Sequence, residues 1–122
     1  MFLELAHTKL DVFTVAKQFV LLCYKETRVF PTEEKFALTS QIRRAAQSVY
    51  LNIAEGCSRR SPAERKRFYE ISRGSLIEVD AALDIAIELN YHSKEKFQEL
   101  GTFVIRTFQL ISKLITSQAR LY

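Results

Sequence analysis

The chain of 122 residues has few of the residues that interrupt helices, with only three glycines and two prolines. This scarcity argues against many short strands joined by turns and favours long helices. No apolar run approaches the roughly 20 residues that cross a bilayer, so we expect no contact with a membrane. The opening stretch, MFLELAHTKLD, lacks the basic lead-in of a signal peptide. A cytoplasmic location is therefore expected.

Cysteine and histidine are also scarce, with two of each. Cys23 and Cys57 form no CxxC pair and are predicted to be free thiols in a reducing compartment, with a disulfide or a reactive thiol as alternatives. A di-iron site in a helix bundle needs two Glu-x-x-His pairs and two further glutamates. Only Glu4 and His7 have that spacing, because the residue three before His92 is leucine. We therefore expect no metal and no cofactor.

The sequence also lacks the motifs of common catalytic sites. No serine, cysteine or threonine lies in a recognisable activating motif, and neither histidine has the context of a general base. There is no glycine-rich phosphate loop. We therefore predict that the protein is not an enzyme and has no catalytic residues.

What the sequence does contain is apolar residues at steps of three and four, which is the spacing of one helix face. They predict helices at about 8–27, 36–56, 62–90 and 94–118. Helices joined by short turns are typical of an antiparallel up-down four-helix bundle, here a single all-α domain spanning residues 1–122.

Local signals mark two helix ends. Ser61, Pro62 and Glu64 have the pattern of a capping box with proline in the first helical position. Gly56 is placed to end the second helix as a left-handed cap. The third helix is expected to turn Phe68 and Ile71 toward the core.

The first and fourth predicted helices carry a second apolar stripe beside the main one. It is either part of a broad core face or a subunit interface, because a soluble monomer seldom exposes a large apolar patch. We favour a homo-oligomer with these interface candidates: Val12, Val15, Phe19, Leu22, Phe103, Leu110, Leu114 and Leu121.

A polar stripe flanks the apolar face of the second helix. We interpret it as a structural network that fixes the register of the second and third helices, through an Arg44–Glu78 pair or contacts centred on Asn52. A ligand site between these helices is the alternative. The network candidates are Gln41, Arg44, Ser48, Asn52, Glu55 and Glu78.

Charge is unevenly distributed along the chain, whose net charge is +4. Residues 43–73 carry eight basic and three acidic residues, whereas residues 74–99 carry two basic and six acidic residues. Four arginines and one lysine lie between residues 59 and 67, at the predicted corner of the second and third helices. The molecule is therefore polarised rather than uniformly basic.

Positive charge near a helix N-terminus opposes the helix dipole, which suggests that the basic corner has a use. Backbone N–H groups and arginines together attract phosphate, so we predict contacts with an RNA or other nucleic-acid backbone. Docking onto an acidic protein and a merely solvated corner are the alternatives. The nucleic-acid-binding candidates are Arg43, Arg59, Arg60, Arg65, Lys66, Arg67 and Arg73.

Three segments carry a family resemblance: LTSQIRRA at 38–45, NIAEG at 52–56 and SRGSLIEV at 72–79. In these the chain resembles the 23S rRNA intervening-sequence protein family, also called the S23 ribosomal protein family. The resemblance implies a left-handed up-down bundle, assembly into a ring that is often a pentamer, and an association with ribosomal RNA. Accessory variability proteins of diversity-generating retroelements are similar in fold, which implies nucleic acid and a reverse transcriptase as possible partners.

Overall fold

The computed structural model describes residues 1–5, 8 and 10–119. Within these residues the chain forms four α-helices and one short 3-10 turn, and no strand. None of the described helices combines the length and the apolar character that a membrane crossing requires. In chain order the elements are α1 (Asp11–Thr27), η2 (Thr32–Glu34), α2 (Leu38–Cys57), α3 (Pro62–Glu88) and α4 (Gln98–Ala119).

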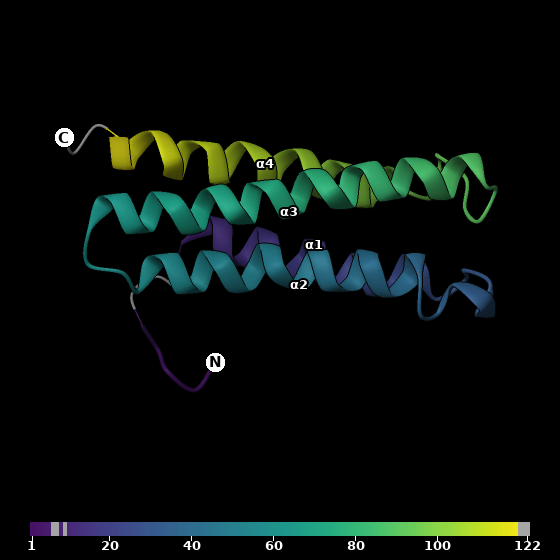
Figure 1. Cartoon of the computed structure of the whole chain (residues 1–122), viewed down its shortest axis with the longest axis horizontal. Helices are drawn as coiled ribbons and strands as arrows, with labels where there is room; N and C mark the ends of the chain where they lie inside the picture. Colours follow the sequence, from purple (N-terminus) through teal and green to yellow (C-terminus); the bar gives the residue numbers. More distant parts are fainter. Residues whose placement is uncertain (6–7, 9, 120–122) are drawn as a thin grey trace.

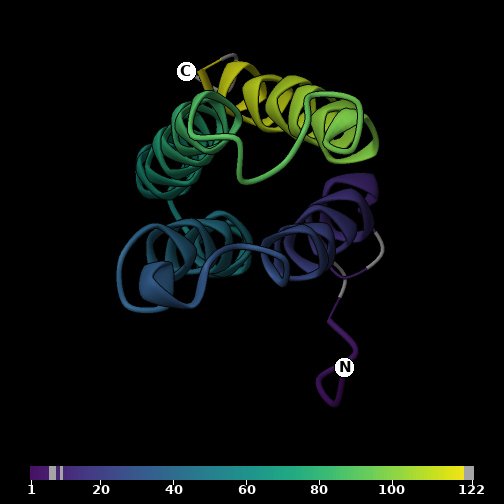
Figure 2. The same ribbon diagram turned by 90° about the vertical axis from the view of Figure 1, so that its right-hand side faces the viewer.

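The four helices stand at the corners of a square when the molecule is seen end-on (Figure 2). Contacts join α1 to α2, α2 to α3, α3 to α4, and α4 back to α1. Consecutive helices run in opposite directions, so the α2–α3 corner and the end of α4 share one end of the bundle (Figure 1). The predicted all-α four-helix bundle is confirmed, and its left-handed twist stays a prediction.

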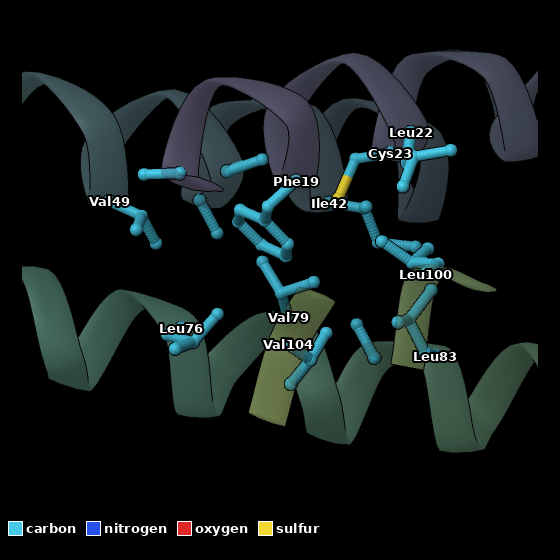
Figure 3. Packing of buried hydrophobic residues seen from close by; sticks show 14 of the residues in the cluster. Phe19, Leu22, Cys23, Ile42, Val49, Leu76, Val79, Leu83, Leu100 and Val104 are labelled. Atoms are coloured by element: carbon cyan, nitrogen blue, oxygen red, sulfur yellow. The ribbon is translucent and has the colours of Figure 1, made fainter. Parts of the chain in front are cut away.

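One apolar cluster fills the space between the helices (Figure 3). Phe19, Ile42 and Leu100 are fully buried there, and Leu76 is 1% exposed. A bundle of this kind buries one broad face of each helix, because each helix touches two neighbours.

The second apolar stripe of α1 belongs to this core. Val12, Val15, Phe19 and Leu22 are between 0% and 8% exposed within the single chain. They are core residues rather than the subunit interface that we predicted, because α1 packs against both α2 and α4 and needs a wide apolar face. On α4, the half-buried residues Phe103, Leu110 and Leu114 pack against the same core, and Leu121 lies outside the described residues.

The start of α3 follows the sequence signal. The Ser61 hydroxyl accepts a hydrogen bond from the backbone N–H of Glu64 at 3.1 Å, and Pro62 is the first helical residue. The prediction that Gly56 ends α2 as a left-handed cap was wrong. The helix continues to Cys57, and none of the three glycines has a positive φ.

The buried face of α3 also differs from the prediction. Tyr69 and Ser72 are buried, while Phe68 is half-buried and Ile71 is 42% exposed. The Ser72 hydroxyl donates a hydrogen bond to the carbonyl of Val49 at 2.7 Å. Because its hydroxyl is hydrogen-bonded, the small Ser72 side chain can be buried against α2, and Ile71 faces away from it.

Candidate nucleic-acid interface

The basic corner between α2 and α3 contains two kinds of cation: those bound to the folded chain and those left free. Arg65 is of the first kind. Its Nε donates to the Gln118 side-chain oxygen at 2.7 Å, and its Nη1 donates to the carbonyls of Arg59 and Arg60 at 3.0 and 2.8 Å. One guanidinium therefore ties the corner loop to the start of α3 and to the end of α4.

Arg59 is also committed to the fold. Its guanidinium pairs with the carboxylate of Glu55 one turn earlier and lies 4.8 Å from the centre of the Phe68 ring. Its Nε is buried with no hydrogen-bond partner among the described residues. Because the arginine covers Phe68, that ring is not offered to a ligand.

Arg60, Lys66 and Arg67 are the free cations of the corner. Arg60 and Arg67 are exposed and Lys66 is half-buried. Within the described part of the chain, none of the three side chains has a hydrogen bond or an ion pair with a protein group. We call these three residues the free corner cations. They flank the first turns of α3, whose N-terminal dipole adds to their attraction for an anion.

Two other predicted nucleic-acid residues lie away from the corner and have structural contacts. Arg43 donates from Nε to the Thr27 hydroxyl at 2.9 Å and stacks over the Tyr24 ring at 4.8 Å, so it joins α2 to α1. It precedes Arg59 by sixteen residues, which is roughly 24 Å of helix.

Arg73 donates to the Ser112 hydroxyl at 3.2 Å and lies over the Phe108 ring, so it joins α3 to α4. Its charge therefore belongs to the contact between these helices. Neither Arg43 nor Arg73 joins the free corner cations, and the phosphate surface is smaller than the sequence suggested.

The polar stripe of α2 meets α3 in a seam of hydrogen bonds. Ser48 and Ser75 share one at 2.7 Å, and the Asn52 amide donates to the Ser48 carbonyl at 2.8 Å. The Gln41 amide bonds to the Glu78 carboxylate across the same seam. The bond between the helices comes from Ser48, because Asn52 bonds only to Ser48 on its own helix, and the polar groups contact each other rather than surround a ligand.

Two residues that we predicted to belong to this network, Arg44 and Glu55, do not take part in it. Arg44 is exposed and does not pair with Glu78, whose carboxylate contacts Gln41 instead. Glu55 pairs with Arg59 at the corner. Sequence reasoning missed Ser75, although a serine at helical spacing opposite Ser48 was a usable signal.

Together the fold and the site define a small four-helix-bundle protein with a compact basic corner. A family model described as 23S rRNA-intervening sequence protein matches residues 8–114. The chain belongs to this family, which confirms the resemblance carried by its second and third helices.

A solved structure shows the same fold. It is the crystal structure of a protein with unknown function from the S23 ribosomal protein family of Bacteroides thetaiotaomicron VPI-5482. It aligns with a TM-score of 0.76 at 20% sequence identity, over 85% of this chain and 97% of that one. At this identity the likeness establishes the fold alone. No curated protein matches the chain.

Proposed function

We propose that the chain is a non-enzymatic, cytoplasmic accessory protein that binds the RNA backbone through the free corner cations. The observation that carries this proposal is that Arg60, Lys66 and Arg67 share one end of the bundle and have no partner among the described residues. A cation that stabilises the fold has hydrogen bonds or ion pairs with protein groups, as Arg65 has with Gln118. These three instead remain available to phosphate oxygens.

The expected mode is contact with phosphates rather than readout of bases. Tyr69 is 3% exposed and Phe68 lies under Arg59, so the corner offers no ring on which a base can stack. Binding through charge alone releases counterions and weakens as salt rises. With three contacts to single-stranded RNA, affinity should fall roughly 20-fold per chain between 50 and 200 mM salt.

We further propose that the protein acts as a homo-oligomer, with a ring of five subunits as the form that the family resemblance implies. In a ring the three cations would recur in every subunit. Several weak patches on one rigid assembly bind a long RNA far more tightly than one patch does, because later contacts form within the same complex.

The test reverses only the free cations. In the triple variant with Arg60→Glu, Lys66→Glu and Arg67→Glu, the affinity for RNA at low salt should fall by about tenfold or more. The dependence of this affinity on salt concentration should also become weaker. Anisotropy of a labelled single-stranded RNA measures both quantities, and light scattering measures the mass of the assembly. Arg59 and Arg65 are left unchanged, because reversing them would break the corner itself.

The matched control reverses three exposed cations, Lys17 and Lys25 on α1 and Arg28 directly after it, so that the net charge changes equally at a distance from the corner. This control should keep most of the affinity and all of the salt slope. Equal losses in the two triple variants would mean that net charge alone is sensed. RNA binding that survives reversal of the corner would contradict the proposed surface, and would favour an acidic protein as its partner.

A further inference from the structure

A long groove follows the outer seam between α3 and α4. A hollow of about 640 Å³ lined by α4 residues alone is followed along it by two hollows of about 420 and 470 Å³ that both helices line. The first two share Phe108 and Gln109, and the last two share Asp80 and Val104, so together they form one continuous path. From Gln98 to Ser117 this path spans roughly 30 Å along α4.

The floor and rims of the groove are apolar. Leu83, Phe97 and Val104 form part of its floor. Ile77 and Ile105, on the rims, are 53% and 61% exposed. This concentration of exposed apolar side chains on facing helices is typical of an interaction site rather than of scattered surface residues.

The two ends of the groove differ in charge. Asp80, Asp84 and Glu95 line one end together with a single ammonium, that of Lys94. None of the three carboxylates forms an ion pair within the part of the chain that the structure describes. At the opposite end Lys113 lines the groove among hydroxyl and amide side chains.

This shape and charge fit an α-helix better than an extended peptide. A helix satisfies its own backbone hydrogen bonds and can lie in an apolar groove, whereas an added β-strand needs a sheet edge, which the described residues do not provide. A fifth helix of about 20 residues would fill the length of the seam by ordinary helix–helix packing.

We propose that the α3–α4 groove binds an amphipathic helix of a partner protein, with cationic side chains of that helix over Asp80, Asp84 and Glu95. A second copy of this chain fits less well. Its most cationic helical segment, the start of α3, has Tyr69 buried and Arg65 bound within its own bundle. The acidic end of this groove lies away from the RNA-binding corner, and the proposal does not depend on RNA binding.

Synthetic helical peptides of about 18 residues test the proposal. The probe has a leucine stripe at helical spacing and lysines in two turns at one end. One control peptide replaces the lysines by glutamates, and another scrambles the leucine stripe. The lysine peptide should bind at micromolar concentration, and both controls should bind at least tenfold more weakly, which corresponds to about 1.4 kcal/mol.

Variants of the protein then locate the site. Asp80→Asn with Asp84→Asn should weaken the lysine peptide about fivefold at low salt, as the loss of two exposed ion pairs does. Ile105→Glu should weaken it more, by placing a charge on the apolar rim. Leu21→Glu is the matched control, because Leu21 is 55% exposed on α1, outside the groove. Circular dichroism should show the same helical content in every variant.

Several results would overturn the proposal. One is the absence of peptide binding up to about 1 mM, and another is equal binding of the lysine and glutamate peptides. Ile105→Glu that binds like the wild type would also place the peptide elsewhere. If Ile105→Glu instead turns a wild-type oligomer into monomers, the groove is covered by a second copy of the chain.

Discussion

Gly56 lies in the last turn of α2, against Phe68 and Tyr69 of α3. A Cβ at this position would lie 2.7 Å from Cε1 of Tyr69 and 3.0 Å from Cβ of Phe68. Because both neighbours are held in the helix contact, the added methyl group must push the helices apart. We expect Gly56→Ala to lower the free energy of unfolding by about 1–3 kcal/mol, measured by urea denaturation.

Gly74 provides the matched control for this substitution. It lies in the interior of α3, whereas Gly56 lies in the last turn of α2, and a Cβ at Gly74 would meet no atom within 4 Å. Gly74→Ala should therefore raise the free energy of unfolding by about 0.5–1 kcal/mol, because alanine favours the helix. If both variants are stabilised, the contact with Tyr69 does not limit the space at Gly56.

Single residues also show why the site was only partly predictable. The sequence placed a cluster of cations at the corner, but nothing local distinguishes Arg65 from Arg67. The difference comes from the path of the corner loop, whose carbonyls at Arg59 and Arg60 accept from Arg65, and from Gln118, 53 residues further along the chain. Which arginines remain free therefore depends on long-range packing that one sequence does not display.

At the scale of elements, helix starts were easier to predict than helix faces. The cap of α3 depends on residues 61–64 alone, so the sequence signal sufficed. The buried face of α3 depends on its contact with α2, where Ser72 fits and Ile71 does not. Apolar periodicity predicted that Ile71 would be buried, whereas in the structure the smaller Ser72 is buried against Val49.

The turn that follows α3 contains a residue in the left-handed conformation, Asn90, whose contribution to stability can be tested. Asn90 has φ 60°, and the N–H groups of Asn90 and Tyr91 bond to the carbonyls of Ile87 and Ala86, both at 3.0 Å. This left-handed turn favours glycine over residues with a Cβ. Asn90→Gly should raise the free energy of unfolding by up to about 1 kcal/mol, and Asn90→Ala should lower it by about 1 kcal/mol.

Chemical denaturation of the two Asn90 variants would measure these changes. Loss of the asparagine side chain occurs in both, so a difference between glycine and alanine reports the backbone conformation. Equal stability of the two variants would show that α3 does not need a left-handed residue to end. The helical signal should be similar in both, because the turn lies beyond the last residue of α3.

On the scale of the whole molecule, the bundle separates charges that adjoin in the sequence. Arg65 and Asp84 both lie on α3, but nineteen residues of helix place them roughly 28 Å apart. The basic corner therefore occupies one end of the bundle, and the acidic end of the groove lies toward the α3–α4 connection (Figure 1). The two proposed surfaces can be occupied together, which suits an accessory protein that joins an RNA to a protein.

The stability of the whole bundle should fall at alkaline pH through Cys23. Its side chain is fully buried, and burial raises the pKa of the thiol from 9.0 to about 12. Between these values the unfolded chain has lost the thiol proton and the folded chain retains it, so stability decreases as pH rises. The stability is fully present below pH 9, and about 1.4 kcal/mol of it should be lost by pH 10.

Comparison with Cys23→Ala isolates this contribution from the tyrosines, which also titrate at high pH. Urea denaturation at pH 6, 8 and 10 would give the free energy of unfolding of both proteins. The difference between them should stay constant from pH 6 to 8, where the thiol is protonated in both states, and shrink by about 1.4 kcal/mol at pH 10. A difference that stays constant up to pH 10 would mean that water reaches Cys23, and that the four helices pack less tightly around it than the structure indicates.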